Sequence, residues 1–306
     1  MRIIIETGTP FQTVKEYLKY ELHLSTGMIS ALKRKERGIC RNGEPVTVRC
    51  LLSPPCELEL AIEDGEEDKN PFLVPEPIPL NLVYEDEGIV VINKPPHMPT
   101  HPSLGHHGGT LANALAYHAE ARGGTFVFRP INRLDRDTSG LVLCAYDRVS
   151  AARYSALLKA GCFQKTYLAV VEGEVQGSGR IDRPIRRATE GIIRRETCRP
   201  EDDGAEEAVT EYRSLATDGQ ISVLCVTPIT GRTHQIRVHM ASLGHPIVGD
   251  TLYGRPNPQM PRQALHAISL QVTDGPKTVR FFAPVPEDIR ACLATHLPKL
   301  NPEELL

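Results

Sequence analysis

The sequence lacks the features that would place it in a membrane or in an oxidising compartment. None of its apolar runs approaches the roughly 20 residues that span a bilayer. The apolar start, MRIIIETG, is broken by Glu6, so no signal peptide is evident. None of the eight cysteines forms a CxxC pair or the Cys/His spacing of a zinc site. We therefore expect a cytoplasmic protein without membrane contact, disulfides or zinc, with Cys144 and Cys225 as reduced thiols in buried strands.

A strong excess of charge of either sign is also missing. The 306 residues carry a formal net charge of −3, which argues against a nonspecific nucleic-acid binder. The two signs are unevenly distributed, because acidic residues crowd into 63–68 and 201–207 whereas arginines crowd into 180–200. This arginine-rich stretch is compatible with an ordinary mixed surface or with a face that contacts phosphates.

The most informative segment is NRLDRDTSGLVLCA at positions 132–145. Its apolar run, 141–145, has no polar alternation and predicts a strand buried on both faces, whereas 137–140 are turn formers. Asp135, flanked by Arg133 and Arg136, should therefore lie at a loop mouth beside a strand. Taken alone, it is either a reactive carboxylate or a simple turn cap.

A second segment, GRTHQIRVHMASLGHPIVGD at 231–250, follows a strand-like run at 221–229. It predicts a turn and then a helix that Gly244 ends. Ile236, Met240 and Leu243 form a core stripe, whereas His234 and Arg237 lie on another face. Considered alone, that face is an ordinary solvated helix surface.

Together the two segments resemble the RluA-type family of RNA pseudouridine synthases, whose hallmark strings are close to HRLDxxTSGLLL and GRTHQIRVH followed by LGHPIxGD. The resemblance continues through YEDEGIVVINKPPHMPTHPS (84–103), KTYLAVVEG (165–173) and FFAPVPEDI (281–289), and it spans about residues 80–290. Asn132 departs from the family pattern, which has His before RLD. The resemblance implies an α+β protein with the pseudouridine synthase fold, a mixed, largely antiparallel sheet with flanking helices, and no cofactor or metal.

The resemblance also implies roles for three residues. Asp135 corresponds to the family's nucleophile, Arg237 to its basic partner, and Tyr167 to the tyrosine that stacks on uracil and assists removal of the C5 proton. The reaction breaks the ribose C1′–N1 bond, turns the base and joins C1′ to C5, so one carboxylate can carry it. Attack on ribose, attack on the base and a glycal route all stay open. Without the resemblance, Tyr167 is an ordinary strand aromatic.

We also predict substrate- or RNA-binding residues in this domain: Arg133, Arg136, Thr138, Arg232 and His234. A stacked uridine must be extruded before it can react. The resemblance implies that the Arg133 guanidinium fills the vacated stack or holds the displaced partner base. The alternative for Arg133 is a salt bridge to Asp137 or Glu172.

The first 62 residues predict a separate small α/β domain. Thr13 and Glu16 form a capping box, and Ser25 caps a second helix that Gly38 would end. Asn42-Gly43 predicts a hairpin between 39–41 and 46–48. Two helices and a hairpin are similar to the S4 RNA-binding domain, which implies RNA contacts from Lys33, Arg34, Lys35 and Arg41. The alternative is a small structural cap.

The remaining organisation follows from composition. The acidic and proline-rich stretch 63–79 predicts a linker, 80–296 the catalytic domain and 297–306 a C-terminal tail. Five histidines, at 97, 101, 106, 107 and 118, suggest a metal site. We reject this interpretation, because no carboxylate or thiol accompanies them at ligand spacing. We interpret 106–109 as a loop before a helix capped by Thr110.

The sequence thus predicts an RNA pseudouridine synthase, an isomerase that acts as a monomer on structured RNA. Ribosomal RNA is favoured over transfer RNA, because S4-bearing family members commonly act on large-subunit RNA; the target uridine is not readable. One rival is a non-catalytic RNA-binding ribosome assembly factor, which Asn132 and the weak S4 charges would suit. A glycoside hydrolase would need a second catalytic carboxylate, and no matching acidic motif stands out.

Overall fold

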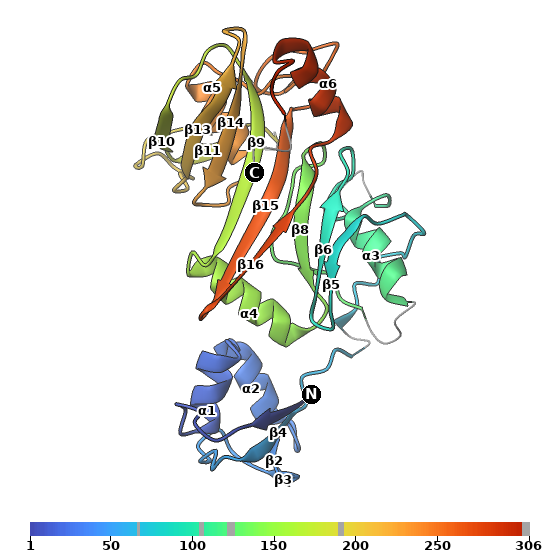
Figure 1. Cartoon of the computed structure of the whole chain (residues 1–306). Helices are drawn as coiled ribbons and strands as arrows, with labels where there is room; N and C mark the ends of the chain where they lie inside the picture. The colour runs from blue at the N-terminus through green and yellow to red at the C-terminus, as the bar shows by residue number, and fades with distance from the viewer. Residues whose placement is uncertain (66–67, 104–106, 121–125, 189–192, 302–306) are drawn as a thin grey trace.

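The computed structural model describes residues 1–65, 68–103, 107–120, 126–188 and 193–301 (Figure 1). Parts of the predicted acidic run, histidine loop, arginine-rich stretch and tail, at 66–67, 104–106, 189–192 and 302–306, lie outside these residues. Within the described ranges, no helix combines the length and apolar character that crossing a bilayer requires. The described residues form a small N-terminal sheet with its own hydrophobic cluster, a large sheet that contributes to two large clusters, and a two-stranded hairpin.

The small sheet and its helices occupy the first 60 residues. Their bounds are β1 (Arg2–Ile5), α1 (Val14–Glu16), the π-helical turn η1 (Tyr17–Glu21), α2 (Thr26–Arg34), β2 (Ile39–Arg41), β3 (Glu44–Pro45) and β4 (Cys56–Leu60), with strand order β1-β4-β2-β3. The capping box of Thr13 and Glu16 is confirmed. Ser25 caps α2 as predicted, since its hydroxyl accepts from the Met28 amide at 3.2 Å.

Several details of this unit differ from the prediction. Strands β1 and β4 were not expected. The hairpin closes earlier, because Asn42 and Gly43 both have positive φ and make a tight turn that pairs Arg41 directly with Glu44. Of the predicted arm 46–48, Val46 continues the pairing, since its amide donates to the Ile39 carbonyl at 3.0 Å, whereas 47–48 lie outside the hairpin. Helix α2 ends at Arg34, and Gly38 serves close packing, since a Cβ there would lie 1.9 Å from the Leu32 carbonyl oxygen.

Part of the acidic stretch anchors the small unit to the rest of the chain. Asp64 pairs with Arg129 and with Arg148, the latter at 2.7 Å, and its side chain is only 9% exposed. Val149 belongs to the hydrophobic cluster of the small unit. Both Arg148 and Val149 lie at the start of the helix above that unit in Figure 1, α4 (Arg148–Lys159). The two sheets therefore share a packed boundary.

The large sheet has ten strands in the order β10-β13-β14-β9-β15-β8-β6-β5, with β16 beside β15 and β7 beside β8. Their bounds are β5 (Leu82–Glu85), β6 (Ile89–Lys94), β7 (Arg129–Pro130), β8 (Ser139–Ala145), β9 (Phe163–Glu172), β10 (Ser178–Asp182), β13 (Val209–Thr217), β14 (Ile221–Pro228), β15 (Leu265–Asp274) and β16 (Lys277–Phe282). Strands β8 and β15 pair in parallel, and the other named pairs are antiparallel.

Helices flank this sheet and a hairpin projects beside it (Figure 1). They are α3 (Leu111–Glu120), α5 (Gln235–Ser242) and α6 (Glu287–His296) beside α4, and the hairpin joins β11 (Ile185–Arg187) to β12 (Arg195–Thr197). All seven residues of β8 are buried, as its unbroken apolar run predicted. Thr110 accepts from the Asn113 amide at 3.3 Å, which confirms its predicted cap of α3. The predicted α+β fold with a mixed, largely antiparallel sheet is confirmed.

Gly140 is required where β8 meets its parallel neighbour. Its φ is +113°, and an added Cβ would lie 2.3 Å from the Ala267 carbonyl oxygen of β15. We expect Gly140→Ala to lower the free energy of unfolding by at least about 2 kcal/mol, because the change combines backbone strain with a backbone clash. Urea denaturation measures this. In the control Gly219→Ala, φ is +87° with nothing within 4 Å of the Cβ. An equal loss in both variants would contradict the clash.

Candidate active site

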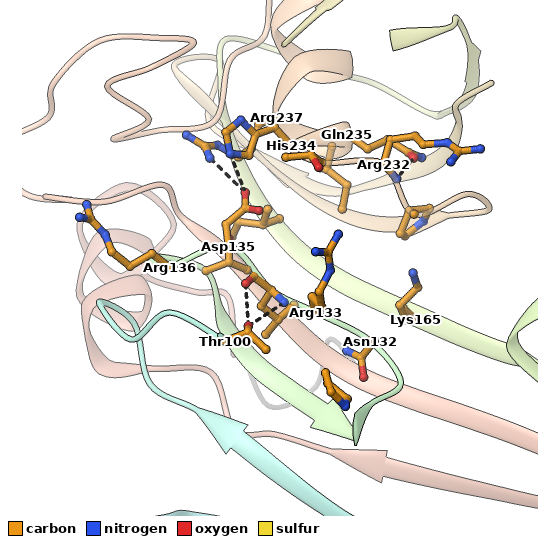
Figure 2. Close-up of a pocket in the computed structure, with 18 of the residues that line it drawn as sticks. Thr100, Asn132, Arg133, Asp135, Arg136, Lys165, Arg232, His234, Gln235 and Arg237 are labelled. Atoms are coloured by element: carbon orange, nitrogen blue, oxygen red, sulfur yellow. Dashed lines mark hydrogen bonds and ion pairs between the residues drawn. The ribbon is translucent and has the colours of Figure 1, made fainter. Parts of the chain in front are cut away.

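A cavity of about 720 Å³ opens over the centre of the large sheet. Its walls come from residues 99–103, the 130–136 loop, β9 and the segment 228–237 that leads into α5 (Figure 2). This volume lies in the range of ligand-binding sites. Eight predicted site residues line it: Arg133, Asp135, Arg136, Thr138, Tyr167, Arg232, His234 and Arg237.

Asp135 and Arg237 lie side by side in the wall of the cavity (Figure 2). Nη1 of Arg237 donates to Oδ2 of Asp135 at 3.0 Å. The other edge of the guanidinium faces Asp250, with Nε donating to Oδ2 at 2.6 Å and Nη2 to Oδ1 at 2.8 Å. Asp250 is fully buried, whereas the Asp135 side chain is 26% exposed. The planar guanidinium therefore joins a buried carboxylate to an accessible one.

Arg237 is held charged although it is buried. Burial alone would lower its pKa, but the hydrogen bonds to Asp250 and the charge of Asp135 raise it above its ordinary value. The guanidinium carbon also lies 5.1 Å from the centroid of the Tyr253 ring, a cation–π arrangement. Arg237 is thus a fixed cation, and its position depends on three neighbours.

The face of α5 that could have been solvated is packed inside the protein. Arg237 and His239 are both buried. The ring nitrogens of His239 lie 2.9 Å from the Thr210 hydroxyl and 2.9 Å from the Arg183 carbonyl oxygen. Ile236 and Met240 enter the main hydrophobic cluster, as the predicted core stripe requires. Helix α5 is therefore buried on more than one face.

His234 precedes α5 in a left-handed conformation, with φ of +58°. This conformation is costly for a residue other than glycine, and such strain is typical of functional sites. Its Nε2 lies 3.8 Å from Oδ2 of Asp135, and its Nδ1 lies 2.9 Å from the Tyr253 hydroxyl. Burial lowers the pKa of His234, against the opposing charge of Asp135. The imidazole is therefore neutral at neutral pH and faces the carboxylate.

Lys94, which is fully buried at the end of β6, holds the loop that carries Asp135. Its Nζ donates to the carbonyl oxygens of Pro95 at 2.9 Å, Met98 at 2.8 Å and Arg136 at 3.0 Å. Burial lowers the pKa of Lys94 to about 7, while the charge of Asp135 opposes that change. The three acceptors match the three hydrogens of an ammonium group, so Lys94 connects two loops of the site.

Two threonines hold the same loop. The Thr100 hydroxyl donates to the Leu134 carbonyl at 2.9 Å and accepts from the Leu134 amide at 3.3 Å. The Thr138 amide donates to the Asp135 carbonyl at 3.1 Å. Thr138 is buried and its hydroxyl accepts from Gln263 at 3.2 Å, which supports a positioning role over direct RNA contact.

Asn132, which replaces the family's usual histidine, bonds to the backbone of β8. Its Nδ2 donates to the Leu141 carbonyl at 3.0 Å, and its Oδ1 accepts from the Leu143 amide at 2.9 Å. The side chain is buried. Both ends of the amide are thereby used in fixing the strand, and the substitution leaves the Asp135–Arg237 contact in place.

Arg133 points into the cavity (Figure 2) and makes no hydrogen bond or ion pair within the described parts of the chain. The two carboxylates considered as alternative partners are already paired. Asp137 receives a bidentate contact from Arg136, and Glu172 bonds to Arg255 at 2.8 Å. Arg136 is therefore directed to its neighbour and away from Asp135.

A second cation without a counterion faces the cavity. Lys165 of β9 makes no hydrogen bond or ion pair with any residue that the structure describes, and burial lowers its pKa. Arg232 lies farther out and pairs with Glu206 at 3.0 Å and with the Glu207 carbonyl at 2.9 Å. Arg133 and Lys165 thus supply the uncompensated positive charge in the cavity, where an anionic ligand would be stabilised.

Tyr167 lies on β9 between β14 and β15, with its side chain buried against the core and one surface on the cavity. Burial and the nearby charge of Asp135 raise the pKa of its hydroxyl. Tyr167 is therefore both a core aromatic and a wall of the cavity, and its hydroxyl is protonated at neutral pH.

The four predicted RNA-binding residues of the small unit lie away from this cavity. Lys35 donates to the Ala61 carbonyl at 2.7 Å, and Arg41 donates to the Leu51 carbonyl. Lys33 and Arg34 lie in the last turn of α2 and are exposed. The basic edge is thus present, but two of its cations also hold backbone carbonyls.

Five residues of the site received no individual role from the sequence: Lys94, Thr100, Lys165, Asp250 and Tyr253. The VGD string ended the recognised motif, but nothing in its spacing indicated that Asp250 would be buried against Arg237. Tyr253, three residues later, had no signal beyond an aromatic beside a glycine. Among the described residues, no group of three or more His, Cys, Asp or Glu side chains could hold a metal ion.

Replacing Asp250 with asparagine tests the buried ion pair. The amide keeps the shape but removes the charge that compensates Arg237, and breaking such a pair costs about 3–5 kcal/mol. We therefore expect Asp250→Asn to lower the free energy of unfolding by about 3 kcal/mol in urea denaturation. Glu206→Gln is the control, because it breaks an exposed pair with Arg232 and should change stability by less than about 1 kcal/mol. Similar losses from both variants would show that Asp250 is not a buried counterion.

Known protein families and sequences resemble this chain. Residues 88–242 match the family described as RNA pseudouridylate synthase. The chain is 40% identical over 281 residues to "Uncharacterized RNA pseudouridine synthase YjbO" of Bacillus subtilis, a match that covers 90% of this chain and 96% of the relative. It is 38% identical over 247 residues to "Ribosomal large subunit pseudouridine synthase D" of Pseudomonas aeruginosa, covering 75% of each chain.

Solved structures give the same result. The human protein "RNA Pseudouridylate Synthase Domain Containing 1" superposes with a TM-score of 0.55 at 28% identity, covering 76% of this chain and 90% of that one. A family match over half of the chain and relatives of this identity leave one conclusion: the chain belongs to the RNA pseudouridylate synthase family and is an enzyme that isomerises uridine in RNA.

Proposed function

We propose that this enzyme forms pseudouridine in large-subunit ribosomal RNA, with Asp135 as the nucleophile. The observation that carries the assignment is the unequal hydrogen bonding of the two oxygens of the Asp135 carboxylate. Oδ2 is held by Arg237 at 3.0 Å, while Oδ1 makes no hydrogen bond within the described ranges and remains available in the cavity. A carboxylate that is oriented through one oxygen and free at the other fits covalent catalysis.

The proposed chemistry needs few groups. The C1′–N1 bond of uridine breaks, C1′ joins C5 after the base turns, and the hydrogen of C5 is lost while N1 gains one. Asp135 would accept the ribose or the base as a covalent partner during this exchange. Tyr167 lines the cavity, and its ring would stack on the uracil. Because the charge of Asp135 helps to raise the pKa of Tyr167, neutralising that charge in a covalent adduct would make the hydroxyl a better acid–base group.

Arg133 is proposed to stabilise the extruded state of the RNA. Its free guanidinium at the cavity supports insertion into the vacated stack or contact with the displaced base, since a planar cation can stack on bases. Lys165 is proposed to contact a phosphate near the target uridine. The missing counterions of both side chains support these roles, because RNA would supply the negative charge.

Ribosomal RNA is proposed as the substrate partly by analogy with the Pseudomonas aeruginosa relative, whose name assigns it to the large ribosomal subunit. We further propose residues 1–62 as an S4-like RNA-binding domain, 63–79 as its linker and 80–296 as the catalytic domain. The exposed ends of Lys33 and Arg34 support RNA contact by this first domain. A monomer in the cytoplasm would satisfy these assignments.

Asp135→Asn should abolish tritium release from RNA that contains 5-tritiated uridine. RNA affinity should change by less than tenfold, about 1.4 kcal/mol, because the carboxylate acts mainly in the chemical step. Release is assayed on large-subunit ribosomal RNA transcribed in vitro, and affinity by filter binding. Asp137→Asn, two residues away on the same loop, is the control and should retain release. Retained release in Asp135→Asn would refute the assignment, whereas release from transfer RNA alone would change the substrate.

The small domain can be tested without deleting it. Replacing Lys33 and Arg34 together with glutamine should weaken binding to the same ribosomal RNA and make the slope of log K against log salt shallower by about 1 to 2, since each phosphate contact contributes about 1. The charge-matched control replaces Lys277 and Lys299, which are exposed and lie outside the first domain. Identical slopes for the two double variants would favour the structural-cap alternative.

A further inference from the structure

Two hydrogen bonds and one longer polar contact connect the β11–β12 hairpin to the Asp135 carboxylate by a route that does not include Arg237. The backbone amide of Arg195, in β12, donates to the Tyr253 hydroxyl at 2.8 Å. That hydroxyl also lies 2.9 Å from Nδ1 of His234. The opposite ring nitrogen of His234, Nε2, lies 3.8 Å from Oδ2 of Asp135. Tyr253 and His234 thus link the backbone of the hairpin to the carboxylate.

The direction of each bond follows from the number of hydrogens. A backbone N–H can only donate, so the Tyr253 oxygen accepts from Arg195. The hydroxyl has one hydrogen of its own, and among the described residues the other polar atom at hydrogen-bond distance is Nδ1 of His234. Nδ1 can accept this hydrogen only if it carries none. In a neutral imidazole the ring hydrogen then resides on Nε2, the nitrogen that faces Asp135.

The other tautomer fits less well. With hydrogen on Nδ1, His234 would donate to Tyr253, whose own hydroxyl hydrogen would then lack an acceptor among the described residues. Nε2 would also present a lone pair to the Asp135 carboxylate, which is repulsive. Burial lowers the pKa of His234 and raises that of Tyr253, so both groups stay neutral near pH 7. The His234 ring therefore carries a single hydrogen, on either Nδ1 or Nε2.

We propose that Tyr253 is a positioning residue for the isomerisation, whose hydroxyl fixes the His234 tautomer that presents Nε2–H to the Asp135 carboxylate. The inference rests on the proposed role of Asp135. At 3.8 Å the pair is too long for a hydrogen bond, and catalytic hydrogen bonds often tighten only when substrate is bound. The N–H would then hold Oδ2 together with Arg237, which leaves Oδ1 to react.

Two structural details support this role. The left-handed backbone conformation of His234 sets the direction in which its side chain leaves the chain. The imidazole ring packs edge-on against the Tyr253 ring, at a centroid distance of 5.7 Å. The Tyr253 ring also lies under Arg237. Tyr253→Phe keeps both ring contacts and removes only the hydroxyl, so it isolates the hydrogen bonds.

The tautomer can be observed directly and without RNA. In full-length protein labelled with ¹⁵N-histidine, long-range ¹H–¹⁵N correlation spectra should show the Nε2–H pattern for His234, with the signal assigned by its loss in His234→Gln. Tyr253→Phe should lose this fixed pattern and show a mixture. Tyr212→Phe, which removes a hydroxyl on β13 outside the cavity, is the control and should leave it unchanged. An Nδ1–H pattern in the wild type would overturn the proposal.

Kinetics test the consequence for the reaction. In single-turnover tritium release from the large-subunit ribosomal RNA transcript, Tyr253→Phe should lower the rate about tenfold, while the dissociation constant for RNA changes less than twofold. In a His234→Ala background, the same change should have no further effect, because Tyr253 would act through His234. A full rate in Tyr253→Phe, or the same tenfold loss in both backgrounds, would refute the role. If the wild type releases no tritium, the proposed function fails, and the spectra still decide the tautomer.

Discussion

The site depends on one guanidinium that is shared by two carboxylates. Arg237 uses one edge for the buried Asp250 and the remaining Nη1 for the accessible Asp135. Burying the guanidinium and the Asp250 carboxylate is favourable only when each charge is compensated with good geometry, and a planar fork meets that condition where a lysine could not. Helix α5, the 250 turn and the 135 loop must therefore come together in a single arrangement.

The order of strands explains how distant segments reach this arrangement. Strands β14, β9, β15 and β8 are neighbours in the sheet although they are separated along the chain. Asp135 lies in the loop that leads into β8, Tyr167 lies within β9, and Arg237 lies in the helix that follows β14. The parallel contact between β8 and β15, where Gly140 allows close approach, places the loop of Asp135 on the side of the sheet where α5 begins.

Much of this could be read from the sequence, since the long motifs predicted the family, the fold class and the residues around the cavity. The unbroken apolar run of β8 and the stripe of α5 were visible because burial imposes a local pattern. Asp250 and Tyr253 received no individual role, because their partners are brought to them only by the tertiary fold. Strands β1 and β4 were missed for a related reason: each is short, and their pairing joins the two ends of the first domain. The sequence predicted the Asn42-Gly43 turn of the first hairpin correctly. The extent of the second arm became clear only from the strand register in the structure.

The packed boundary between the small unit and α4 has a consequence for target choice. Asp64 and Val149 hold the unit against the helix, so the separation between the exposed cations of α2 and Asp135 is set by the fold and not by a loose tether. An RNA that engages both places at once must offer its reactive nucleotide at a matching span. The enzyme would then act as a molecular ruler, which selects a uridine by its distance from an anchoring element more than by the bases beside it.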